Sequence, residues 1–280
     1  MQAEQYELHA AVEARHWWFT ARRRIVVELV RHVVPRGGRV LDVGCGTGAN
    51  VAALAQAYEC RGLDASARAI ELARARFPAV AYDRVDDPAE AARRAADVDG
   101  LLLMDVLEHV EDDFLLLSSL LGALRPGAHA VLTVPADPDL WSAHDEAFGH
   151  FRRYDARRLR RLWEGLPVRE RLCSPYNARL DPLVRLARAA NRRLGRTSGA
   201  SGTDFRVPPA PLNRLLEALF AGEAAALLGS VDRGRPAYRR GVSLVALLRR
   251  EEGTLAPRTR PADLAPDAHY RRGAPGPVVN

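Results

Sequence analysis

The chain contains no lysine, so all 41 of its basic residues are arginine. It has only three cysteines, Cys45, Cys60 and Cys173, and their spacing forms no paired pattern. This spacing excludes a disulfide framework and a zinc motif and fits a reducing cytosol. The absence of lysine also excludes the Tyr-x-x-x-Lys proton relay of an NAD-dependent oxidoreductase.

Long apolar runs are also absent. The longest apolar stretches are short, such as residues 101–104, whereas a membrane span needs about 20 residues. Residues 1–15 are polar and charged, so we expect no secretory signal and a cytoplasmic protein. With 48% hydrophobic and 27% charged residues, the composition is that of a globular protein and excludes a disordered or collagenous one. A length of 280 residues predicts one or two domains.

The net charge of +6 is unevenly distributed. Residues 81–113 hold eleven acids and three arginines, and residues 151–196 hold fourteen arginines and four acids. A basic second half is compatible with nucleic acid, an anionic membrane surface or a phosphorylated substrate as a partner. A solvated arginine-rich surface explains the same charge without any of these partners, and this explanation is the commoner one.

Apolar periodicity predicts the order of the elements. Residues 1–36 are predicted to form a helical cap, with helices at 4–15 and 21–33 separated by His16-Trp17-Trp18-Phe19. The predicted strands that follow are 40–43, 60–63, 80–82, 101–104, 130–134, 168–173 and 242–248. The predicted helices are 49–58, 66–77, 88–96, 112–124, 155–163, 183–194 and 212–228. Such alternation predicts an α/β fold with a doubly wound, Rossmann-like, seven-stranded sheet, in which the strands that alternate with helices are parallel.

The predicted domain therefore covers residues 37–250, with a helical insertion at about 175–230. Residues 197–211 are rich in Gly, Ser and Pro and are predicted to be a loop. Residues 251–280 contain five prolines and no apolar period, so we predict a disordered tail.

A glycine-rich loop follows the first predicted strand, in the sequence Asp42-Val43-Gly44-Cys45-Gly46-Thr47-Gly48. Because glycine has no Cβ, the backbone N–H groups of such a loop approach a ligand closely at the positive end of a helix. Asp64 ends the next strand, twenty residues after Gly44, where an acid hydrogen-bonds ribose hydroxyls. The glycine spacing also satisfies the dinucleotide fingerprint G-x-G-x-x-A. Two further features favour a different family. They are Asp42, which lies two residues before the first glycine, and the third glycine, Gly48.

These motifs resemble the class I S-adenosylmethionine (SAM)-dependent methyltransferases, closely over residues 37–135. The opening His16-Trp17-Trp18-Phe19 and the segment 141–154 are similar to a subgroup of these enzymes. The resemblance implies the fold, SAM as cofactor and methyl transfer as the reaction. It implies that the cofactor-binding residues are Asp42, Gly44, Cys45, Gly46, Gly48, Asp64, Ala65, Asp86, Met104 and Asp105. The adenine contact falls on Asp86 or Asp87, where Asp86-Asp87-Pro88 departs from the family pattern.

Methyl transfer needs the acceptor held in line with an already activated methyl group. A base is needed only when the acceptor must lose a proton, as a hydroxyl does. The first candidate base is His109, which follows the fourth strand at the edge where open α/β sheets bind ligands.

On a helical turn Asp105, Glu108 and His109 share one face. They are candidates for a base or a substrate contact. Alternatively, they belong to a capped helix start, in which Glu108 and His109 form local hydrogen bonds or face solvent and have no role in the reaction. A related Glu-x-x-Glu-His pattern serves metal in some members of the family, but the first acid here is Asp. We therefore predict a site without metal.

A second cluster of histidines and acids follows the fifth strand. His150 is a candidate base there, and His144 and Tyr154 are candidates for the substrate pocket, because substrate loops follow strand ends. The alternative is a packed aromatic loop whose histidines bond to the backbone. Trp17 and Trp18 are predicted to form an aromatic lid over the pocket, or else to belong to the core.

The predicted helix 183–194 is amphipathic and basic. It is able to rest on an anionic membrane and reach a lipid-linked acceptor, which would make peripheral membrane contact part of the function. An ordinary surface helix packed over the edge of the sheet has the same pattern.

The sequence thus predicts a SAM-dependent methyltransferase acting on a small-molecule or glycan- or lipid-linked acceptor, at oxygen. A non-catalytic binding module with the same fold would have a broken cofactor loop, and this loop is intact. An RNA methyltransferase usually adds a module of basic residues and exposed aromatics, which the chain does not show. We therefore do not expect nucleic acid as a partner.

Overall fold

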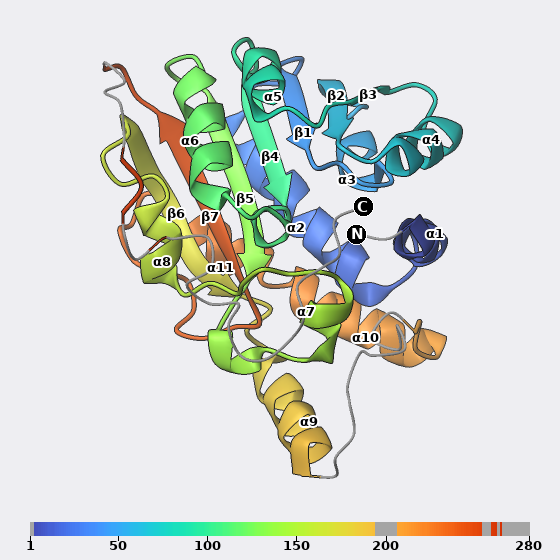
Figure 1. Ribbon diagram of the computed structural model, residues 1–280. Coiled ribbons are helices and arrows are strands. Elements are labelled where there is room, and N and C mark those ends of the chain that lie inside the picture. Colours follow the sequence, from blue (N-terminus) through green and yellow to red (C-terminus); the bar gives the residue numbers. More distant parts are fainter. Residues whose placement is uncertain (1–2, 194–205, 254–258, 262–263, 265–280) are drawn as a thin grey trace.

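The computed structural model describes residues 3–193, 206–253, 259–261 and 264. Seven strands form one sheet in the order β3-β2-β1-β4-β5-β7-β6 (Figure 1). The strands are β1 (Arg39–Val43), β2 (Glu59–Asp64), β3 (Ala81–Arg84), β4 (Gly100–Met104), β5 (His129–Pro135), β6 (Val168–Tyr176) and β7 (Ser243–Arg250). This sheet confirms the predicted doubly wound, seven-stranded fold.

Helices surround the sheet. The α-helices are α1 (Ala3–Val12), α2 (Trp17–Val33), α3 (Ala49–Ala52), α4 (Ala67–Arg76), α5 (Pro88–Ala95), α6 (Asp113–Ala123), α7 (Ala143–Ala147), α8 (Ala156–Arg161), α9 (Asp181–Arg193), α10 (Ala210–Ala221) and α11 (Ala224–Ser230). Two 3₁₀ turns are η1 (Leu107–His109) and η2 (Pro138–Leu140). None of the helices in the described ranges is long and apolar enough to cross a membrane.

The sheet is mixed rather than fully parallel. Strand β7 lies between β5 and β6 and pairs antiparallel with both, whereas β1 to β5 pair parallel with one another. The parallel pairing expected for the strands that alternate with helices is confirmed for β1 to β5. A strand buried on both faces is a continuous apolar run in either direction, so its sequence does not encode its orientation.

Strand β4 shows how the sheet is buried from both sides. Successive side chains of a strand point to opposite faces. Leu101 and Leu103 join the core under α5, α6 and α8, and Leu102 and Met104 join the core under α2, α10 and α11. All four side chains are 5% exposed or less, which explains why this strand has no polar position.

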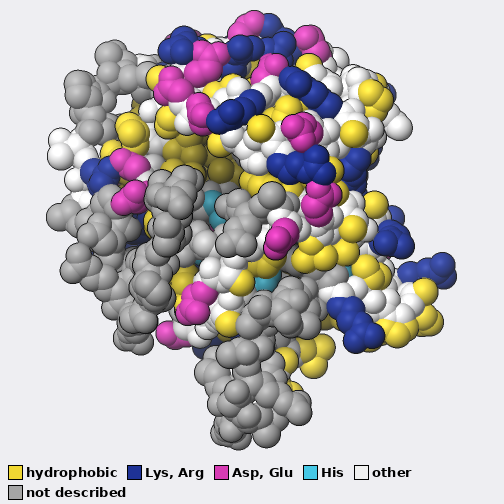
Figure 2. Space-filling view, turned by 45° about the vertical axis from the view of Figure 1, so that its right-hand side comes forward, with side chains coloured by type: hydrophobic (Ala, Val, Ile, Leu, Met, Phe, Trp, Pro, Cys, Tyr) yellow, Lys and Arg dark blue, Asp and Glu magenta, His cyan; other side chains and the backbone are white. Residues whose placement is uncertain are grey.

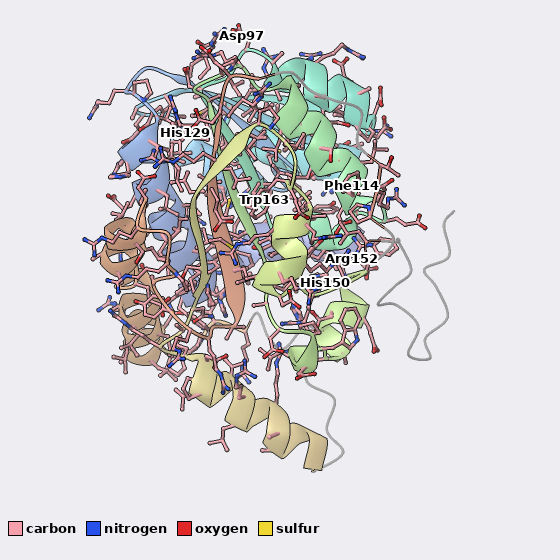
Figure 3. All side chains as sticks on the ribbon, turned by 90° about the vertical axis from the view of Figure 1, so that its left-hand side faces the viewer. Asp97, Phe114, His129, His150, Arg152 and Trp163 are labelled. Carbon is pink, nitrogen blue, oxygen red and sulfur yellow. The ribbon has the colours of Figure 1, made fainter. Side chains whose placement is uncertain are left out.

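The strand order reverses between β1 and β4. The chain leaves β1 toward β2 and leaves β4 toward β5, so the connections after the two strands diverge. Ligands of open α/β sheets bind in the crevice that such a reversal leaves at the carboxyl ends of the strands. His150 and Arg152 lie at this end of the sheet, and Asp97 and His129 lie at the opposite end (Figure 3).

Helix α2 begins at Trp17, four residues before the predicted start. His16 has extended backbone angles, and its Nδ1 accepts the N–H of Trp18 at 3.3 Å, so it caps the helix. The N-terminal aromatic residues therefore form the first turn of α2 instead of a break between helices. The sequence pattern did not predict this cap, because Ser, Thr, Asp and Asn are the usual N-cap residues and histidine is not. Ser66, one of these usual N-cap residues, caps α4.

Two other helices were predicted too long. Residues 49–58 form only the short α3 followed by turns with i→i+3 hydrogen bonds. The predicted helix 212–228 is divided into α10 and α11 around Glu223. The buried carboxylate of Glu223 accepts the N–H groups of Ala178 and Arg179, each at 2.8 Å, which fixes the position of the division. Most of the predicted loop 197–211 and of the predicted tail 251–280 lies outside the described residues.

A buried ionic cluster supports the segment that follows β5. The carboxylate of Asp113, at the start of α6, lies 3.0 Å from Arg158 and 3.5 Å from Arg152. It also accepts the hydroxyl of Tyr154 at 2.9 Å. These four side chains are at most 8% exposed, so water does not replace a lost partner.

Replacing Asp113 with Ala would leave two arginines in the interior without their acid. Breaking a buried pair in this way costs about 3–5 kcal/mol. We expect Asp113→Ala to lower the free energy of unfolding by about that amount in urea titrations. The control is Glu71→Ala, which removes an exposed pair with Arg68 and should change stability by less than about 1 kcal/mol. Equal losses in the two variants would contradict the structural role of Asp113.

Candidate functional site

One cavity of about 640 Å³ opens at the carboxyl ends of β1 and β4. Its wall combines α1, the first turns of α2, the glycine loop after β1, η1 after β4, α7 and part of α9. Figure 2 shows histidine side chains in a hollow, with apolar side chains nearby. The volume lies within the usual range for small-molecule sites.

The glycine loop has the backbone that its residues predict. Gly44, Gly46 and Gly48 have φ angles of +76°, +54° and +88°, which favour glycine. A Cβ at Gly44 would lie 2.4 Å from Val106, and one at Gly48 would lie 2.6 Å from Tyr82, so these two glycines also permit close packing. A Cβ at Gly46 would meet no atom within 4 Å, because this residue faces the cavity.

Asp64 ends β2 beside this loop and lines the cavity. One carboxylate oxygen accepts the N–H of Gly46 and the other accepts the N–H of Ser66, both at 2.9 Å. Burial raises the pKa of Asp64, and the two backbone N–H groups oppose that increase. Each carboxylate oxygen has a further lone pair, so the side chain remains able to accept ribose hydroxyls. Cys45 and Ala65 also line the cavity, as predicted.

Asp42 lies beneath the loop and not on the cavity wall. Its side chain is fully buried on the α2 side of β1, and neither carboxylate oxygen has a hydrogen-bond partner among the described residues. Burial raises the pKa of Asp42 to about 8, although Arg22 opposes this. Asp42 is therefore not part of the cavity wall, and the structure does not support the predicted contact between its side chain and the cofactor.

Asp105 directly follows β4 in the left-handed region, with φ of +56°. Its carboxylate forms an ion pair with Arg22 of α2, and both it and Met104 line the cavity. The helical turn η1 begins only at Leu107. Asp105 therefore does not share a helical face with Glu108 and His109, contrary to the prediction.

The predicted adenine contacts lie elsewhere. Asp86 is exposed, pairs with Arg84 at 3.1 Å and is not part of the cavity wall. Asp87 accepts the N–H of Ala89 at 2.9 Å and caps α5. The structure gives Asp86 and Asp87 roles at the surface because β3 ends before them and α5 begins there.

The two predicted bases meet in the structure. The rings of His109, from η1, and His150, which follows α7, lie edge to face with centroids 4.6 Å apart. Asp145 Oδ1 lies 3.0 Å from His150 Nδ1 and accepts Arg153 Nε at 2.8 Å. Burial lowers the pKa of both histidines, and Asp145 partly offsets this for His150. Their imidazoles are therefore neutral near pH 7 and able to accept a proton or bind a ligand.

The predicted pocket residues separate into two groups. Trp17, Trp18 and His144 line the cavity, and Trp17 also packs edge to face on Phe220 of the core. Tyr154 does not line the cavity. It is fully buried in the core and donates its hydroxyl to Asp113, so its prediction as a substrate contact is wrong.

Sequence analysis missed the part of the wall that comes from α1 and the following turn. Tyr6, His9 and Glu13 line the cavity. Burial lowers the pKa of His9 to about 4 and raises that of Tyr6 to about 12. The helix pattern of residues 4–15 contains no signal for this, because only packing across the loop decides which face of α1 is buried.

Glu13 connects the N-terminal segment to the glycine loop. Its carboxylate accepts the hydroxyl of Thr47 and forms an ion pair with Arg76 of α4. Its backbone oxygen accepts Arg23 Nη2 at 2.6 Å. The side chain is buried, so these contacts hold the N-terminal segment against the loop.

Helix α9 projects from the body of the protein (Figure 1). Val184, Ala187 and Arg188 line the cavity, whereas Leu183 and Leu186 are 60% and 68% exposed. The helix thus borders the cavity with one face and leaves apolar side chains on the other. The predicted contact with a membrane remains a prediction.

Comparison with known proteins agrees with the fold and the site. Residues 14–191 match the methyltransferase domain family. The chain is 32% identical over 102 residues to a ubiquinone biosynthesis O-methyltransferase of Cupriavidus pinatubonensis, covering 35% of this chain and 41% of that protein. It is 34% identical over 118 residues to a trans-aconitate 2-methyltransferase of Methylobacterium radiotolerans, covering 41% and 45%. The alignments thus span less than half the length of these two relatives.

Solved structures show the same fold at low identity. A TehB-like SAM-dependent methyltransferase from Corynebacterium glutamicum has a TM-score of 0.50 and 14% identity, over 82% of this chain and 88% of that one. Phosphoethanolamine N-methyltransferase 2 of Haemonchus contortus, solved with SAM, has a TM-score of 0.51 and 15% identity, over 81% and 52%. The family match covers more than half of the chain and includes the glycine loop, Asp64 and both histidines. The protein is therefore a member of the methyltransferase domain family, with the fold of the class I SAM-dependent methyltransferases.

Proposed function

We propose that this protein transfers a methyl group from SAM to a hydroxyl oxygen of a small-molecule or glycan- or lipid-linked acceptor. One observation carries the proposal: a single cavity joins the glycine loop and Asp64 to the histidine pair. The part of the wall formed by the glycine loop and Asp64 suits a nucleoside. The part formed by the histidine pair suits an acceptor group that must lose a proton. Both parts lie at the strand reversal, where the fold binds ligands.

The residues present fit SAM. Gly46 has no side chain, so it leaves space for a ligand where the side chain of another residue would extend into the cavity. The loop also precedes the amino end of α3. Asp64 has the lone pairs to hold ribose hydroxyls, and Ala65 and Met104 supply neighbouring apolar wall. A bound SAM supplies a methyl group already activated on a sulfonium. The protein then has to orient the acceptor and exclude water.

The acceptor end is formed by His109, His144 and His150 beside Trp17, Trp18 and Phe19. Aromatic rings pack against the apolar part of an acceptor, and Asp145 fixes the ring of His150. The neutral histidines are suited to help remove the hydroxyl proton. The names of several relatives, among them the ubiquinone biosynthesis O-methyltransferases, support oxygen as the methylated atom.

Asp64→Ala should weaken SAM binding. Hydrogen bonds to a charged group contribute about 1.5–3 kcal/mol, so we expect an increase in the Kd of about 10–100-fold. Calorimetric titration with SAM measures this directly. The control is Asp83→Ala, which removes a partly exposed acid of the neighbouring strand β3 and should leave the Kd unchanged. An unaltered Kd in Asp64→Ala would contradict the assignment of the nucleoside end.

Glu13→Gln should weaken SAM binding while residue 13 keeps its contact with the side chain of Thr47. The amide keeps an acceptor for Thr47 but removes the charge that faces Arg76. A charge-assisted hydrogen bond is about twice as strong as a neutral one, so we expect a Kd several-fold higher. Glu7→Gln, which affects an exposed pair with Arg68, is the matched control in α1. Identical affinities in the two variants would mean that α1 does not support the loop.

His150→Ala should lower kcat with little change in the Kd for SAM. A positioned acid–base group contributes about 10²–10⁴-fold, so a loss within that range is expected. The measurement is release of S-adenosylhomocysteine with a panel of catechols, hydroxy acids and monosaccharides as probes. His32→Ala, at an exposed position of α2, is the control. Full activity of His150→Ala on an accepted probe would exclude the histidine pair from the reaction.

A further inference from the structure

We infer that Glu108, His109 and His150 form a binding site for a divalent transition-metal ion at the acceptor end of the cavity. The three residues come from η1 and from the turn after α7, and all line the cavity. One ligand atom of each lies within 4.8 Å of the others. Among the described residues no other such group of histidines, cysteines and acids occurs.

Two of the three side chains have buried polar atoms that need a partner. Glu108 is 1% exposed, and its Oε2 has no hydrogen-bond partner among the described residues. The same holds for Nδ1 of His109. Burying such atoms without a partner is unfavourable, whereas an ion placed between them would bind both.

The ion pairs around the site leave one acid, Glu108, without a cationic partner among the described residues. Asp105 is paired with Arg22, and Asp145 is paired with Arg153. No ion pair joins Glu108 to any residue that the structure describes. Arg22 and Arg153 are thus already matched by other acids, and Glu108 is the remaining acid that an ion would bind.

His150 is also prepared as a ligand. Its Nδ1 faces Asp145 at 3.0 Å, which leaves Nε2 for the ion. Asp145 is itself held by the N–H of Ser142 and by Arg153 Nε, both at 2.8 Å. A carboxylate that orients a metal-binding histidine in this way is the usual arrangement around protein metal sites.

The ligand set indicates the kind of ion. Two imidazoles and one carboxylate suit Zn²⁺, Fe²⁺ or Co²⁺, and three protein ligands leave open positions. Asp105 is not one of the proposed ligands, and His150 is the third ligand in its place. No sequence pattern predicted this set of three. The expectation of a metal-free site is revised accordingly.

The consequence for the acceptor rests on the proposed function. Open positions facing the cavity would favour an acceptor with two neighbouring oxygen atoms, such as a vicinal diol or a catechol. An ion there lowers the pKa of a hydroxyl that binds to it. His109 and His150 would then act as ligands, and the proton of the bound hydroxyl would pass to solvent at the open side of the cavity.

The test is titration of the full chain, without an affinity tag, with Co²⁺, followed by its visible absorption spectrum. We expect one equivalent to bind with the spectrum of a nitrogen- and oxygen-ligated site and to be displaced by Zn²⁺. Glu108→Gln and His109→Asn should each weaken binding by more than about tenfold, and Asp145→Asn by about 10–100-fold. His32→Ala, at a distant surface histidine, should bind like the wild type.

Circular dichroism of each variant separates loss of the site from loss of the fold. The inference is overturned if the wild type binds no Co²⁺ with such a spectrum, or if Glu108→Gln and His109→Asn both bind as tightly as the wild type. SAM titrations on the same samples keep the two proposals apart. SAM binding without Co²⁺ binding would remove only the metal site, whereas Co²⁺ binding without SAM binding would remove only the proposed function.

Discussion

The reversal of strand order between β1 and β4 is the constraint on which the site depends. Because the chain leaves these neighbouring strands in opposite directions, the glycine loop and η1 diverge and a crevice remains between them. The cavity wall begins with these two segments, and α1, α2 and α7 close it from the outside. The glycine loop and Asp64 on one part of the wall are therefore adjacent to His109 and His150 on the other part because of topology and not because of proximity in sequence.

Around this crevice the protein buries an unusual number of charged groups. Arg22 pairs with Asp105, Arg153 with Asp145, and Glu13 with Arg76. Burying charges in pairs limits the unfavourable desolvation, and each pair connects two segments of the wall. Asp42, Asp64 and Glu108 are buried acids without an ion pair in the described part of the chain, and burial raises the pKa of Asp42 and of Glu108 to about 8. Glu108 lines the cavity, and Asp42 lies in β1 just before the glycine loop.

The N-terminal segment is a functional part of the site. The first turn of α2 supplies Trp17 and Trp18, and α1 supplies Tyr6 and His9. Glu13 and Arg22 then connect this segment to the glycine loop and to the end of β4. The cavity thus lies between the sheet and a segment that precedes the sheet in the sequence.

The sequence by itself determined the alternation of strands and helices, the glycine loop and Asp64, because these depend on local rules of burial period and backbone angle. It also indicated His109 and His150 separately. Only the tertiary structure decided that the two histidines meet beside Glu108, that Tyr154 is core and that Asp86 lies at the surface. It also decided the direction of β7 and the role of Glu13. These features depend on which segments pack together across long distances in the chain, and a residue's own neighbours in sequence contain no information about that packing.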